Sequence, residues 1–272
     1  MQKYSVLMSL YSKEKPEYLI AAIESMLGQT MKPDEIVIVK DGPLTDALDQ
    51  VVSEYESRFP DLFHIVVSPV NIGLGQALNL GLRNCRNELV ARMDTDDISK
   101  PERCEKQLER FEKDEELCLL GSAVDEFCST PEEVISRRVV PTESGDIYRF
   151  AKRRSAFNHP TVMYKKSAVL ALGGYADLRR NQDVDLFGRM LFSGCKAENF
   201  EESLLWFRSN QDLAKRRKSW QNTKSYIDTI RRFYKMGYSS FWDYVIVAIA
   251  QTGMFLMPVG LQQWVYKRFL RK

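Results

Sequence analysis

The sequence predicts an α/β fold with a doubly wound, mostly parallel sheet and a helical extension at the C-terminal end. In the first third of the chain, apolar strand-like runs alternate with helical stretches of about ten residues or more, as in βαβ units. One run ends in three carboxylates, Asp94, Asp96 and Asp97, and open α/β sheets bind ligands beyond the carboxyl ends of their strands. The 272 residues suffice for one large domain, or one domain with an appendage.

The alternation of elements is regular up to residue 93. We expect strands at residues 6–10, 35–39, 64–67 and 89–93, and helices at residues 17–27, 44–58 and 74–85. Pro16 suits the first turn of a helix, and Asp41-Gly42-Pro43 is typical of a turn. These elements predict a nucleotide-binding sheet in the first half of the chain.

A glycine-rich phosphate loop is missing from the expected place. The first glycine is Gly28, so the turn after the first strand is neither a dinucleotide-binding loop nor a Walker loop. Gly73 and Gly75 do not complete such a loop, because Leu78 stands where the third glycine would fall. A diphosphate bound without this loop needs a metal ion to neutralise it.

The acidic strand end is the candidate site for that metal. Side chains alternate along an extended segment, so we expect Asp94 and Asp96 to point to the same side and Asp97 to point elsewhere. The pair is suited to share one divalent cation, or one cation and a sugar hydroxyl. The alternative is a solvated acidic turn, with Ser99 capping a helix before Pro101.

Cysteine content indicates a reducing compartment. The five cysteines are scattered and form no C-x-x-C pair, which argues against a disulfide framework and against a zinc site. Met1 is followed within a few residues by a strand-like run instead of a secretory signal. We therefore expect a cytoplasmic protein.

Positive charge is concentrated at the C-terminal end. From Arg208 to Lys272, thirteen Lys and Arg residues stand against three Asp and Glu, a net charge of +10. The preceding residues, with 26 basic and 34 acidic side chains, carry −8. This asymmetry predicts that the tail faces a polyanion, either anionic lipid or nucleic acid.

Several short motifs occur together along the chain. In order they are Ser5 to Tyr11, Val39-Lys40-Asp41-Gly42, Asn71-Ile72-Gly73, Asn79-Leu80-Gly81, Arg92-Met93-Asp94-Thr95-Asp96-Asp97, Pro101-Glu102-Arg103, Asn158-His159-Pro160-Thr161, Gly173-Gly174-Tyr175 and Gln182-Asp183-Val184-Asp185-Leu186. As a set they resemble family 2 glycosyltransferases with the GT-A fold, of the bacterial surface-polysaccharide type. Two departures from the family pattern are Gln182, where Glu is usual, and Asn210, where many relatives carry His.

The resemblance implies a role for each matched residue. Asp41 would accept a hydrogen bond from a uracil ring, and Tyr11 would flank that base. Asp94 would contact the ribose and help to hold the metal, while Asp96 would bind the Mn²⁺ or Mg²⁺ of the donor diphosphate. Asp183 would be the catalytic base, and the remaining substrate-binding candidates are Asn71, Arg92, His159 and Arg208.

Several of these residues also have structural interpretations. Asp41 can be a turn residue, and Asn71 can shape the entry to the next helix. His159 can be a core or turn histidine before Pro160, and Arg92 can pair with a carboxylate beneath the site. Asp185 competes with Asp183 for the role of base, because a helix beginning near Gln182 would point the two carboxylates roughly 200° apart.

The tail favours a membrane surface over nucleic acid. Residues 244–266 carry no charge but are too polar for a spanning helix, which favours an interfacial hairpin. Upstream, basic pairs and runs alternate with aromatic residues, a pattern typical of basic amphipathic helices at lipid surfaces: Lys215 to Lys218, Trp220, Tyr226, Arg231, Arg232, Phe233 and Tyr234. The alternative is that these helices pack on the catalytic domain. The acidic first part of the chain and the lack of a nucleic-acid-binding module argue against nucleic acid.

We therefore expect a transferase domain over residues 1–210 and a basic amphipathic helical tail over residues 211–272. The resemblance implies inverting, metal-dependent transfer of one sugar from a nucleotide-diphosphate donor, UDP-linked, to a lipid-linked saccharide at the inner face of the cytoplasmic membrane. No Q-x-x-R-W motif of processive synthases follows Asp183, which favours single addition. The alternatives are a non-catalytic nucleotide-binding scaffold and a sugar-phosphate nucleotidyltransferase.

Overall fold

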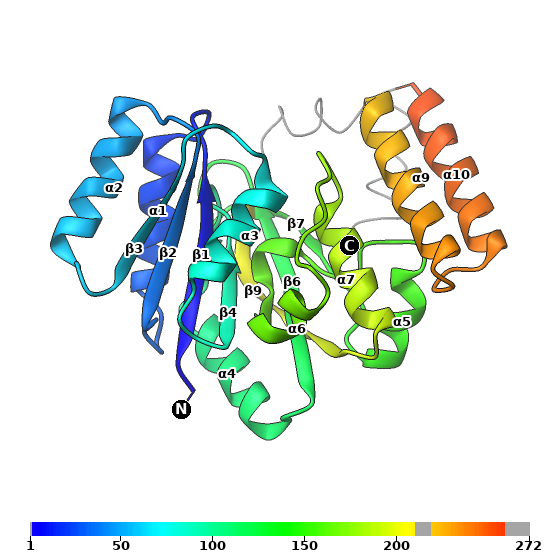
Figure 1. Ribbon diagram of the computed structural model, residues 1–272, viewed down its shortest axis with the longest axis horizontal. Helices are drawn as coiled ribbons and strands as arrows, with labels where there is room; N and C mark the ends of the chain where they lie inside the picture. The colour runs from blue at the N-terminus through cyan, green and yellow to red at the C-terminus, as the bar shows by residue number, and fades with distance from the viewer. Residues whose placement is uncertain (1, 210–218, 259–272) are drawn as a thin grey trace.

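The computed structural model, which describes residues 2–209 and 219–258, has one large sheet with helices on both faces (Figure 1). The chain follows the predicted alternation closely up to residue 93, and the differences are of one or two residues at element ends. Its elements are β1 (Tyr4–Leu10), α1 (Pro16–Leu27), β2 (Glu35–Asp41), α2 (Asp46–Arg58), β3 (Phe63–Ser68), α3 (Leu74–Asn84) and β4 (Leu89–Met93).

The rest of the described chain adds both the longest and the shortest strands of the sheet, and further helices. They are β5 (Ile98–Ser99), α4 (Arg103–Lys113), β6 (Leu117–Phe127), β7 (Val134–Arg138), α5 (Ser144–Ala151), a 3₁₀ turn (His159–Thr161), β8 (Met163–Lys165), α6 (Lys166–Ala171), α7 (Gln182–Phe192), β9 (Lys196–Arg208), α9 (Trp220–Lys235) and α10 (Phe241–Leu256).

The sheet has the strand order β3-β2-β1-β4-β8-β6-β9-β5, with β7 paired to β6. The strands β3, β2, β1 and β4 are mutually parallel, as predicted. Beyond β4 the pairing is mixed, because β8 is antiparallel to both β4 and β6 whereas β9 is parallel to β6. The predicted α/β fold is confirmed, and its parallel part carries the carboxyl ends of β1, β2 and β4 to one edge.

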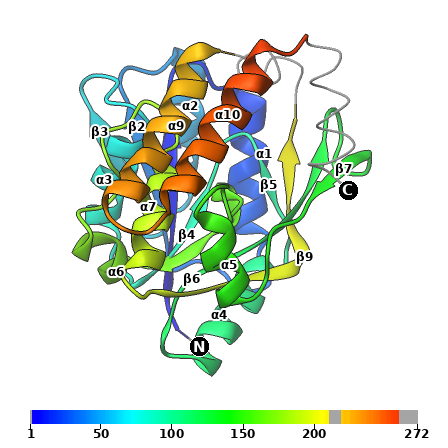
Figure 2. The same cartoon turned by 90° about the vertical axis from the view of Figure 1, so that its right-hand side faces the viewer.

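Two hydrophobic clusters fill the two faces of this sheet. Alternation along β1 sends Leu7 to one face and Val6 and Met8 to the other. The cluster that contains Leu7 also takes side chains of α3, α5, α7 and α9, whereas the other is covered by α1, α2 and α4. Figure 2 shows the same layers from the side of α9 and α10.

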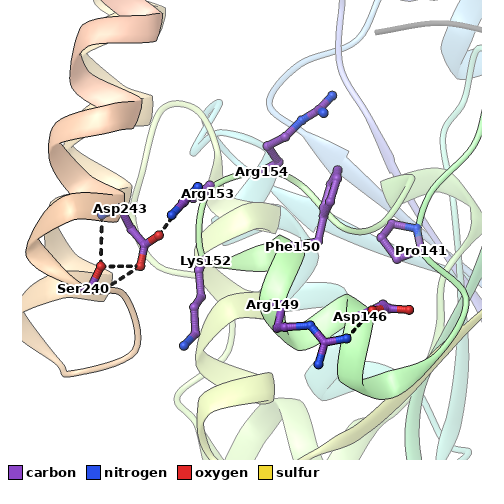
Figure 3. Close-up of a pocket in the computed structure, with 9 residues that line it drawn as sticks. All are labelled: Pro141, Asp146, Arg149, Phe150, Lys152, Arg153, Arg154, Ser240 and Asp243. Atoms are coloured by element: carbon purple, nitrogen blue, oxygen red, sulfur yellow. Dashed lines mark hydrogen bonds and ion pairs between the residues drawn. The ribbon is translucent and has the colours of Figure 1, made fainter. Parts of the chain in front are cut away.

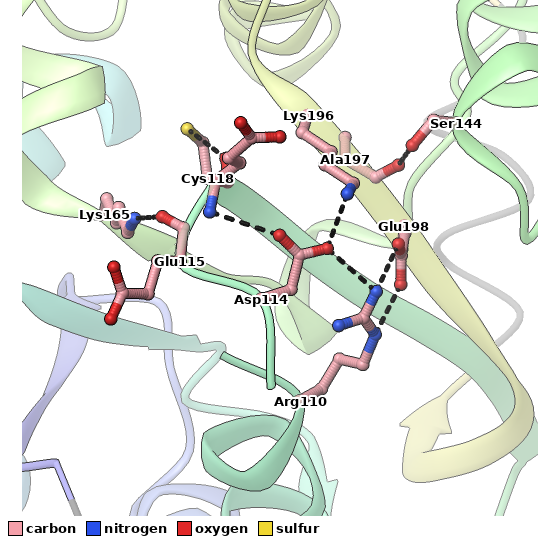
Figure 4. A network of polar contacts seen from close by, with 10 residues as sticks. Arg110, Asp114, Glu115, Cys118, Ser144, Lys165, Lys196, Ala197 and Glu198 are labelled. Carbon is pink, nitrogen blue, oxygen red and sulfur yellow. Dashed lines mark hydrogen bonds and ion pairs between the residues drawn. The ribbon is translucent and has the colours of Figure 1, made fainter. Parts of the chain in front are cut away.

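A polar network anchors β9 to α4 at the start of the strand (Figure 4). Arg110 donates to Glu198 at 2.7 and 2.6 Å and to Asp114 at 3.1 Å, and Asp114 also accepts from Lys196 at 2.6 Å. These interactions, led by the hydrogen bond from Lys196, lower the pKa of Asp114. The network fixes the beginning of β9, and Arg208 lies at the other end of that strand.

The helices α9 and α10 lie side by side and pack against the sheet domain (Figures 1 and 2). Phe233 of α9 occupies the space that a side chain at Gly188 of α7 would need, since an added Cβ would lie 2.1 Å from its ring. Arg232 of α9 pairs with Asp185, and Arg153 pairs with Asp243 of α10. The described part of the tail is therefore packed on the sheet domain, which was the alternative interpretation.

The other expectations for the tail have mixed outcomes. The described residues of 244–266 belong to the single helix α10 and its end, while Lys215 to Lys218, Asn210 and residues 259–272 lie outside the described residues. None of the helices in residues 2–209 and 219–258 has the length and apolar character that a membrane span requires. The domain boundary after residue 210 stays a prediction.

Candidate active site

The candidate site lies where β1, β2 and β4 end at the same edge of the sheet. Tyr11 directly follows β1 and is 36% exposed, Asp41 is the last residue of β2, and Asp94 directly follows β4. Pairing of β1 with both neighbours in parallel brings these positions together. Residues that are far apart in the sequence thus lie at adjacent strand ends, which is where the site was expected.

Three carboxylates form a tight cluster at the end of β4. One oxygen from each of Asp94, Asp96 and Asp97 lies within 4.8 Å of the others. Burial and the neighbouring carboxylates of Asp94 and Glu14 raise the pKa of Asp96 to about 7. Burial and the same cluster raise the pKa of Asp97 well above its usual value. The negative charges of the cluster therefore repel one another.

The expectation for Asp97 is wrong, and so is the helix cap that the alternative interpretation assigned to Ser99. Asp97 belongs to the cluster instead of pointing elsewhere, because the chain turns after Met93 and strand alternation no longer applies. Ser99 does not cap a helix. It lies in β5, where its backbone N–H donates to Ser25, and the residue preceding α4 is Glu102.

Arg208 closes one side of the acidic cluster. Its backbone N–H donates to Oδ1 of Asp97 at 2.8 Å, and its Nε donates to the carbonyl oxygen of Asp96 at 2.9 Å. The guanidinium lies 4.0 Å from the ring centroid of Tyr18 and 4.6 Å from that of Phe127. These aromatic faces hold the cation in place.

Arg92 supports the cluster from beneath. It is 1% exposed, and its Nη2 pairs with Asp94, which was one of the two interpretations of this residue. Burial alone would lower the pKa of Arg92. The charge of the Asp94 carboxylate and its hydrogen bond together outweigh this effect, so the pKa is raised. Within the described part of the chain, Nε and Nη1 of Arg92 have no hydrogen-bond partner. The side chain is thus held by a single carboxylate.

Asp41 organises the loop that precedes α3. Its two carboxylate oxygens accept from the backbone N–H groups of Ile72 at 2.6 Å and Gly73 at 3.1 Å. Asn71 returns a hydrogen bond from Nδ2 to the carbonyl oxygen of Asp41 at 3.1 Å. Gly73 has a φ of 82°, which favours glycine. Asp41 therefore shapes this loop, and its contact with a base stays a prediction.

His159 begins the 3₁₀ turn and contacts Tyr175 and Phe187. Its Nε2 is 3.0 Å from the hydroxyl of Tyr175, and its ring packs edge-on against Phe187. Burial, and secondarily the charge of Arg92, lower the pKa of His159 well below its usual value. The imidazole is therefore neutral at neutral pH.

Asp183 and Asp185 have different surroundings on α7, which begins at Gln182 as expected. The Asp185 carboxylate is buried and accepts from Arg189 at 2.8 Å and from Arg232 at 3.0 Å. Asp183 has no such ion pair among the described residues. Its burial raises its pKa, and this effect outweighs the opposing hydrogen bond from the backbone of Val184.

The structure adds residues that sequence reasoning did not assign to the site. Glu14 accepts from Thr95 at 2.8 Å and faces Asp96. Tyr175 interacts electrostatically with both Asp94 and Asp183, and Tyr226 of α9 interacts with Asp183 and Arg138. Tyr175 was visible as part of a motif and Tyr226 as an aromatic residue of the tail, but no local signal places Glu14 or Tyr226 at the site, because their neighbours there are distant in sequence.

The carboxylate oxygens of the acidic cluster are suitable ligands for a hard divalent cation. Carboxylate oxygens are the ligands that Mg²⁺, Mn²⁺ and Ca²⁺ prefer. Within the described residues, Oδ2 of Asp97 is buried without a hydrogen-bond partner. A cation held by Asp94, Asp96 and Asp97 would offset the repulsion that raises the pKa of Asp96 and of Asp97.

Comparison with known proteins identifies the family. Residues 5–171 match the family described as Glycosyl transferase family 2. The chain is a family 2 glycosyltransferase. This glycosyltransferase is 37% identical to the amylovoran biosynthesis glycosyltransferase AmsE of Erwinia amylovora, with 97% of this chain and 98% of the relative covered. It is 34% identical to an Escherichia coli UDP-Gal:alpha-D-GlcNAc-diphosphoundecaprenol beta-1,3-galactosyltransferase, with 99% and 97% covered.

A solved structure supports the same conclusion for the fold. The mannosyltransferase PcManGT of Pyrobaculum calidifontis, in complex with GDP-Man and Mn²⁺, is similar to the glycosyltransferase with a TM-score of 0.65 at 14% identity. The likeness covers 98% of this chain and 79% of that chain. The expected GT-A fold and the resemblance to family 2 enzymes of the bacterial surface-polysaccharide type are confirmed.

Proposed function

We propose that this glycosyltransferase transfers one sugar, with inversion, from a UDP-linked donor to a saccharide carried on a lipid diphosphate in surface polysaccharide synthesis. The relative from Escherichia coli, similar over 99% of this chain, uses a donor and an acceptor of these classes by its name. The observation that carries the proposal is the cluster of Asp94, Asp96 and Asp97 at the end of β4, which offers the carboxylates that a cation on a diphosphate donor would need.

Asp183 is the group that we assign to proton transfer. In an inverting transfer the acceptor hydroxyl oxygen forms a bond to the anomeric carbon while the bond to the donor phosphate breaks, and the hydroxyl proton passes to a carboxylate. A raised pKa makes Asp183 a stronger base than an ordinary aspartate, provided that it is ionised. Asp185 is unsuited to the role because two arginines occupy its oxygens.

The acidic cluster is the proposed holder of Mn²⁺ or Mg²⁺. The ion would stabilise the negative charge of the departing nucleoside diphosphate. Asp96 and Asp94 are the proposed ligands, as the resemblance implies, and Asp97 is added because its oxygens share the cluster. Arg92 orients Asp94, and Arg208 orients the backbone of Asp96 and the carboxylate of Asp97.

The proposed binding of the donor base uses the neighbouring strand ends. Tyr11 is exposed enough to lie against a uracil ring, and Asn71 belongs to the loop that Asp41 holds. Both carboxylate oxygens of Asp41 already accept one backbone N–H each, so a uracil contact would use their remaining lone pairs. His159, kept neutral, is proposed to contact the acceptor side.

We also propose that the protein is cytoplasmic and attaches peripherally to the inner face of the cytoplasmic membrane through α10. Apolar side chains recur on one side of this helix at intervals of four, three and seven residues: Trp242 (69% exposed), Ile246 (45%), Ile249 (69%) and Leu256 (73%). An exposed apolar stripe of this kind suits burial at the boundary between head groups and acyl chains.

The first experiment is a calorimetric titration of the protein with UDP in the presence of Mn²⁺, repeated with EDTA. We expect micromolar binding that chelation abolishes. Release of UDP from a panel of UDP-sugars, with GlcNAc-diphosphoundecaprenol as acceptor, then tests transfer. UDP binding with no release of UDP from any donor would favour the non-catalytic scaffold, and binding of GDP or dTDP but not UDP would overturn the choice of base.

A further inference from the structure

Tyr175 is held at its backbone by the side chain of Asn79 on α3. Oδ1 of Asn79 accepts from the N–H of Tyr175 at 2.8 Å, and Nδ2 donates to the carbonyl oxygen of Tyr175 at 2.8 Å. Gly174 has a φ of 75°, and a Cβ at this position would lie 2.2 Å from Oδ1 of Asn79. Only glycine therefore permits this close approach. The two motifs that contain Asn79 and Tyr175 are thus joined, and the proposed function gives neither residue a role.

Arg189 of α7 is a second anchor for the same segment. Its Nη1 donates to the carbonyl oxygen of Leu172 at 2.8 Å, and its Nη2 donates to that of Gly174 at 2.7 Å. These carbonyl groups follow the end of α6, where the helix itself supplies no donors. The helices α3, α6 and α7 pack into the same hydrophobic cluster (Figure 1). The backbone around Tyr175 is therefore fixed by groups from two helices.

The fixed phenol of Tyr175 contacts the imidazole of His159. Tyr175 is 2% exposed, and its hydroxyl oxygen lies 3.0 Å from Nε2 of His159. His159 is half-buried, and within the described residues its Nδ1 has no hydrogen-bond partner. A neutral imidazole carries one proton, on either Nδ1 or Nε2. The position of this proton decides whether Nδ1 donates or accepts a hydrogen bond.

Hydrogen-bond accounting places the proton on Nδ1. Burial raises the pKa of Tyr175, so its hydroxyl keeps its proton, and a buried O–H group needs an acceptor. Nε2 of His159 is at the right distance. The hydroxyl of Tyr164 is the other nearby group, but it opposes the rise in the pKa of Tyr175, which is the effect of a donor to the phenol oxygen. Nε2 is therefore the acceptor and is unprotonated, so the proton of the neutral imidazole lies on Nδ1.

His159 lies about one helical turn from Asp183. Its ring packs edge-on against Phe187, with 5.8 Å between the ring centroids. Phe187 and Asp183 are four residues apart on α7, so they share one face, and a helical side chain leans toward the preceding turn. The carbonyl oxygen of Val162, which follows the 3₁₀ turn, accepts from the N–H of Arg92 at 2.9 Å. The turn that carries His159 is thus attached to β4 as well.

We propose that Tyr175 is a positioning residue that holds His159 with its proton on Nδ1, so that this N–H donates a hydrogen bond to an oxygen of the acceptor sugar beside Asp183. The inference rests on the proposed function and adds the direction of one hydrogen bond to it. A protonated Nδ1 has no lone pair for a metal ion, which assigns it to the sugar. Without Tyr175, the imidazole would favour a proton on Nε2, as histidine does in water, and Nδ1 would become an acceptor.

The first test is an NMR spectrum of the ring nitrogens in the full-length protein with isotope-labelled histidine. The chain has two histidines, so the spectrum of His64→Gln assigns the signals. We expect a protonated Nδ1 and an unprotonated Nε2 for His159 in the wild type, and a shift of the proton toward Nε2 in Tyr175→Phe.

Tyr238→Phe is the matched control for this spectrum. Tyr238 is 1% exposed, and its hydroxyl donates to the carbonyl oxygen of Tyr148 at 2.8 Å, so the variant also loses a buried hydrogen bond. The His159 signals should not change in this variant. A proton on Nε2 of His159 in the wild type would overturn the proposal, and this measurement needs no variant. An unchanged tautomer in Tyr175→Phe would overturn it as well.

The second test separates acceptor binding from donor binding. With GlcNAc-diphosphoundecaprenol and the UDP-sugar selected from the panel, Tyr175→Phe should raise the KM for the acceptor by roughly three- to tenfold, the effect of one neutral hydrogen bond. UDP affinity in the presence of Mn²⁺ should change less than twofold, and Tyr238→Phe should alter neither quantity. An unchanged acceptor KM in Tyr175→Phe would overturn the role of His159. No transfer by the wild type would count against the proposed function, whereas the NMR spectrum still decides the tautomer.

Discussion

Arg232 on α9 donates from Nε to Oδ1 of Asp185 on α7 at 3.0 Å, which ties the C-terminal helices to the helix that carries Asp183. The contact distinguishes the two neighbouring aspartates of α7, because only Asp185 takes part in it. Asp185 joins helices, whereas Asp183, two residues earlier, has no such ion pair among the described residues and is the proposed base. Substitution of Asp183 and substitution of Asp185 should therefore have different measurable effects.

Asp183→Asn should reduce the rate of UDP release by about 10²–10⁴-fold, the usual contribution of a positioned base, with the free energy of unfolding nearly unchanged. Asp185→Asn should instead lower the free energy of unfolding by about 2 kcal/mol, because two charge-assisted hydrogen bonds are weakened. Urea unfolding and steady-state kinetics on both variants check this. The reverse pattern would assign the base to Asp185.

The acid limb of the pH profile should reflect the raised pKa of Asp183. A base must be ionised, so kcat/KM should fall as the pH drops through this pKa, at a higher pH than the value of about 3.9 for an ordinary aspartate. Arg138 favours the ionised form, and Arg138→Gln should move the limb to still higher pH. Arg137→Gln is the control, because Arg137 pairs with Asp125. An unmoved limb in Arg138→Gln would contradict the assignment.

Asp96→Asn should abolish the Mn²⁺-dependent part of UDP binding. In the absence of metal the same variant should melt at a higher temperature than the wild type, because one of three mutually repelling carboxylates is removed. Calorimetry and thermal melts with EDTA measure the two effects. Asp61→Asn, which removes an exposed carboxylate, should change neither. UDP affinity in Asp96→Asn equal to that of the wild type would refute the metal assignment.

Gly188→Ala should loosen the contact between α7 and α9. The new methyl group would lie 2.1 Å from the ring of Phe233, and overpacking of this kind costs about 1–3 kcal/mol. Gly253→Ala in α10 meets nothing within 4 Å and should be neutral or raise the free energy of unfolding by about 0.5 kcal/mol. Urea titrations of the two variants would disprove the packing argument if Gly188→Ala were as stable as Gly253→Ala.

Trp242→Ser/Ile249→Ser should weaken sedimentation with vesicles of anionic lipid by roughly tenfold or more, because two large apolar side chains no longer enter the interface. Val67→Ser/Val70→Ser provides the control, since these valines are 62% and 60% exposed near β3. Equal sedimentation of all three proteins would show that α10 does not attach the protein to membranes.

Local patterns were sufficient for the first third of the chain. The strands and helices up to Met93 follow from side-chain periodicity, which packing against one sheet enforces. The acidic strand end was found for the same reason. The position of Asp97 was not, because the chain leaves the strand after Met93 and its direction depends on Arg208, which is distant in sequence.

Contacts between distant segments account for the other differences. The sequence suggested a lipid-facing role for Arg232, but its guanidinium is used by Asp185, a pairing that no local pattern reveals. The cavity of about 850 Å³ between α5 and the start of α10 (Figure 3) was missed in the same way, because Lys152 and Asp243 come to line the same cavity only after folding. Motif resemblance supplied the candidate roles of Asp41, His159 and Asp183, and these stay predictions.

The hydrogen bonds from Arg208 have a consequence for biosynthesis. Chains emerge from the ribosome with the N-terminal end first and begin to fold during synthesis. A nascent chain therefore presents Asp94, Asp96 and Asp97 more than a hundred residues before the arginine that fixes them, whose separation from Asp97 is 111 positions. The hydrogen bonds that fix the acidic cluster can therefore form only after translation has passed Arg208.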